Sequence, residues 1–166
     1  LERAKEAGVV ALLDPATDLA SNRTVVGLAK QHRELYAGIG LHPHDAQQMT
    51  PEFLAQLREL AKEPKVVAIG EIGLDYYRDL SPREVQKEVF QTLLRLAEET
   101  RKPVILHCRD AYDDLIRILR ETRKPPIAGL MHCFAGNLEI AKETLGLGLN
   151  ISFAANLTFP KAQPLR

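Results

Sequence analysis

Short apolar runs rich in β-branched residues alternate with longer segments in which apolar residues recur every three or four positions. The runs predict strands over residues 9–13, 36–41, 66–70, 103–106, 127–131 and 149–153. The segments between them have the spacing of helices that lie on a sheet. Alternation of this kind requires parallel strands joined by right-handed helical crossovers, so the sequence predicts an α/β fold.

Capping residues indicate where several of these helices begin. Ser21 is predicted to cap a helix that runs to about His32, and Thr50 precedes a proline in the first helical turn of the next. The segment 81–84 reads Ser-Pro-Arg-Glu, the pattern of a capping box. Gly136-Asn137 opens a further helix. Each predicted helix therefore follows a predicted strand after a short turn.

The length limits how much of a barrel such units can build. Eight β/α units need roughly 250 residues, whereas this chain has 166. We expect a single domain over residues 1–166 that forms about six units of a TIM-like (β/α)8 barrel, with the first strand and the last strand missing. The chain opens in what looks like the middle of a helix, without an initiator Met, so we interpret it as part of something longer.

Charge and cysteine content narrow the class of protein. Lys plus Arg and Asp plus Glu both number 22, and a net charge of zero argues against broad electrostatic capture of nucleic acid. Two cysteines are too few for a disulfide scaffold, which fits a reducing cytoplasm. No apolar run approaches the roughly 18 residues of a membrane span, and no signal peptide is evident. We therefore predict a cytoplasmic protein with no membrane contact.

Four polar side chains come directly after four of the predicted strands: His42, Glu71, His107 and His132. Any one histidine at such a place is commonly a hydrogen-bonded structural group. In a barrel, however, the carboxyl ends of all strands open on one mouth. Imidazoles and a carboxylate that converge there suit a divalent ion such as Zn, Mn, Fe or Co. A carboxylate can also bridge two ions about 3.5–4 Å apart.

The segment 66–77 carries the carboxylate of this group. Its apolar run is predicted to stop at Gly70, directly before Glu71. Gly70 and Gly73 are predicted to let the backbone turn tightly and approach what Glu71 holds. The alternative is that Glu71 only begins a solvated loop.

Other polar residues flank these candidates. His42 and His44 straddle a proline and can contact a substrate phosphate or take part in proton transfer; the alternative is that both face solvent. Arg109 can clamp an anionic oxygen. Asp110 is either part of the site or only the N-cap of the next helix.

The two cysteines, Cys108 and Cys133, each follow a candidate ligand by one position. Side chains alternate between the two faces of a strand. We therefore predict that both point away from the site and pack in the core.

Four segments resemble the motifs of the TatD family of metal-dependent hydrolases, in order and at compatible spacing. They are Gly40–His44, Gly70–Tyr77, Pro103–Ala111 and Met131–Phe134. The resemblance implies a TIM-like barrel of the metallo-dependent hydrolase (amidohydrolase-like) superfamily. It also implies a 3′→5′ exonuclease or deoxyribonuclease that hydrolyses phosphodiesters.

The same resemblance implies roles for individual residues. Glu71 would be a catalytic residue and the bridging ligand of two divalent ions, Mg, Mn or Zn, with His107 and His132 as further metal ligands. His42 and His44 would lie by the scissile phosphate as catalytic and substrate-binding residues, and Arg109 would bind substrate. The resemblance also implies a His-x-His pair on a first strand and an Asp on a last strand, and it would place both of these ligand motifs outside residues 1–166.

Three functions follow as alternatives. The first is a phosphodiesterase that acts on DNA or an oligonucleotide. Few aromatic residues, with Tyr 4, Phe 5 and Trp 0, indicate a short contact with one strand end. The second is a metal-dependent hydrolase of a small ester, amide or lactone. The third is an inactive truncated barrel that serves in binding, because an open sheet leaves exposed edges.

Overall fold

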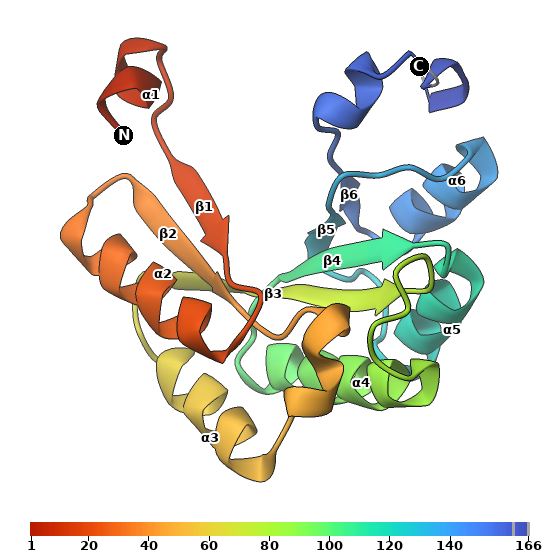
Figure 1. The fold of residues 1–166 in the computed structure, drawn as a ribbon, viewed down its shortest axis with the longest axis horizontal. Coiled ribbons are helices and arrows are strands. Elements are labelled where there is room, and N and C mark those ends of the chain that lie inside the picture. The colour runs from red at the N-terminus through yellow and green to blue at the C-terminus, as the bar shows by residue number, and fades with distance from the viewer. Residues whose placement is uncertain (161, 166) are drawn as a thin grey trace.

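The computed structural model describes residues 1–160 and 162–165, and its centre is a six-stranded parallel sheet (Figure 1). The strands are β1 (Leu12–Pro15), β2 (Leu35–Ile39), β3 (Val66–Asp75), β4 (Val104–Arg109), β5 (Gly129–Met131) and β6 (Asn150–Ile151). They follow one another across the sheet in sequence order, and every neighbouring pair is parallel. The predicted α/β class and the six alternating units are confirmed.

Helices connect the strands and cover the sheet. They are α1 (Glu2–Glu6), α2 (Leu19–Gln31), α3 (Pro51–Leu60), α4 (Arg83–Glu99), α5 (Tyr112–Thr122) and α6 (Leu138–Gly146). Short 3-10 helices span η1 (Pro43–Gln48), η2 (Ala155–Thr158) and η3 (Gln163–Leu165). Helix α2 packs on β2, and α4 packs on β3 and against α5. Figure 1 shows α2 to α5 arranged along one side of the curved sheet.

Helix α4 shows why this arrangement is stable. Its apolar residues recur at three and four positions, and Phe90, Leu93 and Leu94 are almost fully buried. Truncation of one such leucine to alanine typically costs about 2–5 kcal/mol. The stripe that the sequence shows is therefore the face that holds α4 on β3.

Strand β3 differs from its prediction. It does not stop at Gly70 but continues through Glu71 to Asp75, and its register against β4 shifts between Ile69 and Ile72. Gly73 has φ +147°, and a Cβ there would overlap the carbonyl oxygen of His107. The glycines thus allow a local bulge and a close approach of β4, where the sequence had suggested a turn.

Strand β1 begins later than predicted. It starts at Leu12, whereas Val10 is 89% exposed. The reason lies in the neighbouring strand, because Leu12 pairs with Leu35, the first residue of β2. Residues before Leu12 have no partner strand among the described residues, so their β-branched side chains do not define a buried strand.

Two of the predicted caps are confirmed and one is displaced. Thr50 accepts from the backbone N–H of Phe53, and Asn137 accepts from that of Ile140. Helix α2, however, is capped by Asp18, and Ser21 is the third helical residue that completes the capping box. Both side chains accept hydrogen bonds from backbone N–H groups at the start of the helix. Ser21 therefore belongs to the cap of α2, but at the third helical position and not at the N-cap.

Two further caps are not formed. The N-cap of α4 is Pro82, whose side chain has no hydrogen-bonding group, and the hydroxyl of Ser81 donates instead to the carbonyl oxygen of His44. The N-cap of α5 is Ala111, while Asp110 stands at φ +54°. The capping-box prediction over 81–84 and the N-cap alternative for Asp110 are therefore wrong. Ser81 serves a contact between elements that local sequence cannot reveal.

Candidate metal centre

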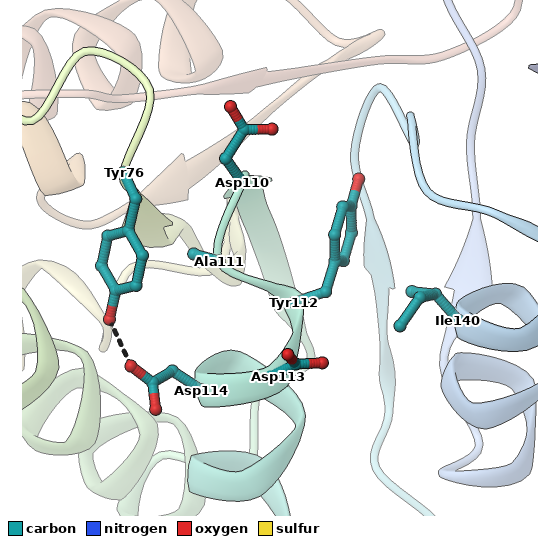
Figure 2. A pocket seen from close by; sticks show the side chains of 7 residues that line it. All are labelled: Tyr76, Asp110, Ala111, Tyr112, Asp113, Asp114 and Ile140. Carbon is teal, nitrogen blue, oxygen red and sulfur yellow. Dashed lines mark hydrogen bonds between the residues drawn. The ribbon is translucent and has the colours of Figure 1, made fainter.

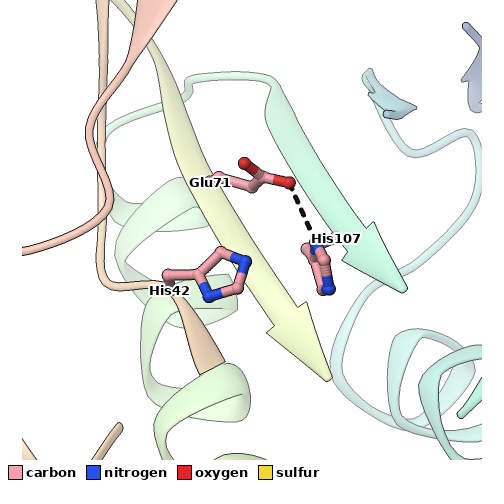
Figure 3. Close-up of side chains that lie close together, drawn as sticks. All are labelled: His42, Glu71 and His107. Atoms are coloured by element: carbon pink, nitrogen blue, oxygen red, sulfur yellow. Dashed lines mark hydrogen bonds and ion pairs between the residues drawn. The ribbon is translucent and has the colours of Figure 1, made fainter. Parts of the chain in front are cut away.

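Three donors gather where β2, β3 and β4 come together. His42, Glu71 and His107 each offer one ligand atom, and these atoms all lie within 4.8 Å of one another. Figure 3 shows the three side chains turned toward one space, with the hydrogen bond from His107 Nδ1 to Glu71 Oε1, 3.1 Å long. Glu71 is contributed from the middle of β3, and His42 from the residue that caps η1.

Asp75 belongs to the same group, and the sequence analysis missed it as a site residue. Its Oδ2 lies 3.0 Å from Nε2 of His107 and 2.9 Å from Nε2 of His44. Its Oδ1 accepts from the backbone N–H groups of Tyr77 and Arg78. Once β3 is known to continue past Glu71, strand alternation places positions 71 and 75 on one face, which is the signal that would have found it.

Helix α4 fixes the end of β3 through Gln86. The side-chain oxygen of Gln86 accepts from the backbone N–H of Asp75, and its Nε2 donates to the carbonyl oxygens of Asp75 and Ser81. Ser81 in turn donates to His44. Gln86 is 1% exposed. A buried amide with all its groups bonded holds Asp75 and the His44 loop in one arrangement.

The loop that presents His42 is held from the β1 side. The buried side chain of Asn22 donates to the carbonyl oxygen of Gly40 and accepts from its N–H at 2.9 Å. The N–H of His42 donates to the carbonyl oxygen of Thr17 at 2.8 Å. Hydrogen bonds to the backbone of Gly40 and His42 therefore hold the loop that carries the His42 ring.

The charges of the group follow from burial and from these contacts. Burial, with the nearby His107, lowers the pKa of His42 to about 4, so its imidazole is neutral near pH 7. Burial alone would raise the pKa of Glu71, but the hydrogen bond and charge of His107 outweigh it and lower the pKa. For Asp75, N–H donors and histidines outweigh burial and lower the pKa to about 2.

His107 has the opposite shift. Burial would lower its pKa, but Glu71 and Asp75 raise it above the usual histidine value. Each of its ring nitrogens faces a carboxylate oxygen, and carboxylates only accept, so both nitrogens carry a proton. A cation that binds here therefore takes the place of a proton.

The donor set fits a divalent metal ion. Two ionised carboxylates and neutral imidazole nitrogen are the ligand types that Zn, Mn, Fe and Co accept. A carboxylate behind a histidine, as Asp75 stands behind His107 and His44, is the usual way to orient a metal-ligating ring. The compact group contains His42, whereas His132, which the sequence also predicts as a metal ligand, lies outside it.

His132 lies at the side of the group. Its charge contributes to the lowered pKa of Glu71, but it is not one of the three donors that converge within 4.8 Å. Its Nε2 lies 3.2 Å from Sγ of Cys133, and its Nδ1 lies 3.5 Å from Oγ of Ser152. The imidazole thus faces the β6 side, where no described carboxylate holds it.

The two cysteines differ from each other. Cys108 is buried in the core, as predicted. The prediction for Cys133 is wrong, because its thiol contacts His132 rather than the helices. Cys133 lies beyond the end of β5 and has φ +48°, so strand alternation no longer decides where its side chain points.

A pocket of about 480 Å³ lies beside the carboxyl ends of β3 and β4 (Figure 2). Its lining consists of Tyr76, Asp110, Ala111, Tyr112, Asp113, Asp114 and Ile140. The hydroxyl of Tyr76 donates to Asp114, and burial followed by this contact raises the pKa of Tyr76 to about 12. Three carboxylates make the lining unfavourable for phosphate groups.

Fold and site define a class: an α/β protein of TIM-barrel type whose strand ends carry a candidate centre for divalent ions. The sequence profile of the family described as "TatD related DNase" matches residues 1–166. The chain belongs to this family.

Relatives agree with this assignment. A protein named "Uncharacterized metal-dependent hydrolase YabD" of Bacillus subtilis is 41% identical over 163 residues, which are 98% of this chain and 64% of that protein. The "3′-5′ ssDNA/RNA exonuclease TatD" of Cronobacter sakazakii is 39% identical, over 90% of this chain and 57% of its own length. The chain thus spans about three fifths of these relatives.

Solved structures show the same architecture. The crystal structure of YJJV, a TatD homologue from Escherichia coli, superposes with a TM-score of 0.91 at 36% identity and covers 98% of this chain and 63% of that one. A TatD-family hydrolase from Entamoeba histolytica gives 0.87 at 30% identity, over 94% and 55%. The TIM-like barrel type is therefore shown for this chain. Among the described helices, none has both the length and the apolarity to cross a bilayer.

Proposed function

We propose that the protein is a metal-dependent phosphodiester hydrolase that removes nucleotides from the 3′ end of DNA. The observation that carries this proposal is the buried group in which ionised Glu71 and Asp75 meet His42 and His107. The relative from Cronobacter sakazakii bears the name of a 3′-5′ exonuclease, which supports the same direction of cleavage. A cytoplasmic site of action stays a prediction from the sequence.

In this proposal His42, Glu71 and His107 would hold one divalent ion, Mg, Mn or Zn. Glu71 and His132 would hold a second. When bound, such ions polarise a phosphoryl oxygen and make a water a better nucleophile at neutral pH. Asp75 holds the ring of His107 in place, because its Oδ2 lies 3.0 Å from Nε2.

His44 is the residue we place beside the scissile phosphate. Its Nε2 donates to Asp75, so this nitrogen carries a proton and Nδ1 is the atom free to act. The side chain is 28% exposed, which leaves it open to a substrate. Neutral, Nδ1 accepts a proton; protonated, it donates to a phosphate oxygen. His42, whose ring centroid lies 4.3 Å away, faces the same space.

A hydrolase of a small ester, amide or lactone would use the same metal group. A comparison of three substrates distinguishes the two functions. A 5′-labelled single-stranded 12-mer, bis-p-nitrophenyl phosphate and a p-nitrophenyl carboxylate ester are incubated with the protein and Mn²⁺. The proposal expects a ladder of products shortened from the 3′ end, and little turnover of the carboxylate ester. Turnover of the ester alone would favour the small-substrate hydrolase.

Substitutions tie the activity to the site. We expect Glu71→Gln to lower the cleavage rate by about 1,000-fold, because the negative charge at the centre of the donor group is removed. His132→Ala should lower it by about tenfold to 100-fold. The matched control is Glu59→Gln, which alters an exposed carboxylate that pairs with Lys62. If Glu71→Gln and His132→Ala leave the rate within twofold, the assignment is wrong.

A further inference from the structure

An exposed aromatic ring and an exposed guanidinium lie face to face beside the candidate metal centre. Tyr77 is 59% exposed, and the guanidinium carbon of Arg109 lies 3.7 Å from the centroid of its ring. Large aromatic side chains are usually covered, so an exposed one that is held by a cation is available to a ligand.

The charge of Arg109 is not neutralised within residues 1–160 and 162–165. Its guanidinium has no salt bridge or hydrogen bond to any described residue, although carboxylates are common around it. Five N–H donors on its edge are therefore free. Arg109 thus combines a face laid on an aromatic ring with an edge that can meet an anion.

The neighbouring tyrosine shows what a purely structural pair looks like. Arg83 lies 4.4 Å over the ring of Tyr76, but it also pairs with Asp79 at 3.0 Å. Tyr76 is half-buried, and its hydroxyl donates to Asp114. In that pair the cation, the ring and the hydroxyl all have partners, which leaves nothing for a ligand.

The Tyr77–Arg109 pair is tied to the catalytic group by the backbone. The N–H of Tyr77 donates to Oδ1 of Asp75 at 3.0 Å, and the same carboxylate holds His107. Across β3 and β4, Gly73 pairs with His107 and Asp75 pairs with Arg109. Arg109 therefore lies two residues beyond His107, on the same face of the sheet.

We propose that Tyr77 and Arg109 form a stacking platform for a nucleobase of single-stranded DNA, one nucleotide from the phosphate at the metal centre. This inference rests on the proposed function, of which it specifies the substrate contact. Bases stack on aromatic rings and on guanidinium planes without regard to sequence. The edge of Arg109 then meets the flanking phosphate, whereas the acidic pocket lined by Asp110, Asp113 and Asp114 keeps phosphates off its side.

The test compares variants that keep or lose the ring of Tyr77, on substrates that keep or lose the base expected to stack on it. Tyr77→Leu removes the ring and keeps bulk, and Tyr77→Phe keeps the ring. Each variant cleaves a single-stranded 12-mer in Mn²⁺, either intact or with an abasic site at the second position from the 3′ end. We expect Tyr77→Leu to raise KM for the intact strand about tenfold or more, with kcat little changed. Tyr77→Phe should resemble the wild type, and the abasic strand should show no difference between the three proteins.

Binding gives a second readout that does not depend on turnover. Fluorescence anisotropy with a labelled single-stranded 5-mer, in EDTA, should show weaker binding for Tyr77→Leu and for Arg109→Lys, and unchanged binding for the control Arg83→Lys. Thermal unfolding followed by circular dichroism verifies that each variant is folded.

The outcomes separate the platform from the proposed function. Equal effects of Tyr77→Leu on intact and abasic strands, or a loss in kcat alone, would show that Tyr77 acts only through Asp75 and would overturn the platform. Ring-dependent binding without any DNA cleavage would retain the platform and reject the nuclease proposal. A wild type that neither binds nor cleaves the strand would reject both.

Discussion

The ends of β3–β4 and of β5–β6 each carry a histidine, but they hold it in different ways. On the β3–β4 side the strands are 10 and 6 residues long, and the ring of His107 lies between the carboxylates of Glu71 and Asp75. On the β5–β6 side the strands are 3 and 2 residues long, and His132 has a thiol and a hydroxyl as neighbours. The difference teaches that a site is organised where the paired strands are long. A histidine that follows a short strand is positioned by weaker contacts.

The largest effect is expected from a change that pushes β3 and β4 apart. Gly73→Ala adds a Cβ that would overlap the carbonyl oxygen of His107, at φ +147°. Overpacking and backbone strain each cost about 1–3 kcal/mol, so we expect a loss of about 3 kcal/mol in the free energy of unfolding, measured by urea denaturation. The control is Gly27→Ala in α2, where no atom lies within 4 Å of the new Cβ. That variant should be stabilised slightly. Equal stability of Gly73→Ala and the wild type would contradict the close approach.

The next effect compares the two histidines directly. Zn²⁺ affinity, measured by isothermal titration calorimetry, should fall about 100-fold in His107→Ala and about tenfold in His132→Ala, because only His107 is a member of the compact donor group. The control is His32→Ala, the residue at the C-cap of α2, which does not belong to the donor group. A larger loss in His132→Ala than in His107→Ala would reverse the ranking of the two regions.

A third prediction concerns pH and Asp75. Its pKa is lowered to about 2 in the folded protein from an ordinary value of 3.8, by N–H donors and histidines that outweigh burial. The stability that this shift contributes is present above pH 4 and is lost as pH falls toward 2. In EDTA at pH 6, the free energy of unfolding of the wild type should exceed that of Asp75→Asn by on the order of 2 kcal/mol. This difference should shrink as the pH falls below 4. Asp113→Asn, at an exposed position, serves as the control. A difference that grows toward low pH would contradict the assigned sign.

The smallest effect is expected at Ser152. Its hydroxyl lies 3.5 Å from Nδ1 of His132, which is at the limit of a hydrogen bond. Ser152→Ala should therefore change Zn²⁺ affinity less than threefold. A loss of Zn²⁺ affinity as large as the 100-fold loss expected for His107→Ala would show that the β5–β6 side is organised as firmly as the β3–β4 side.

The sequence by itself determined the α/β class, the order of six parallel units and the family. These features depend on local patterns, namely apolar runs, helical spacing and turn residues. Such patterns determine local structure through interactions among a few neighbouring residues. It also singled out Glu71 and His107, because each follows an apolar run directly, and the structure places their side chains 3.1 Å apart.

Only the tertiary structure decided how β3 continues, which residues join the site and what Ser81 and Cys133 contact. Asp75 meets His107 because the bulge in β3 sets the register against β4, and no local pattern fixes a register between strands 30 residues apart. Ser81 gives up a cap to bind the His44 loop. Such choices are made by contacts between distant segments, whose free energy exceeds the local preference of any one residue.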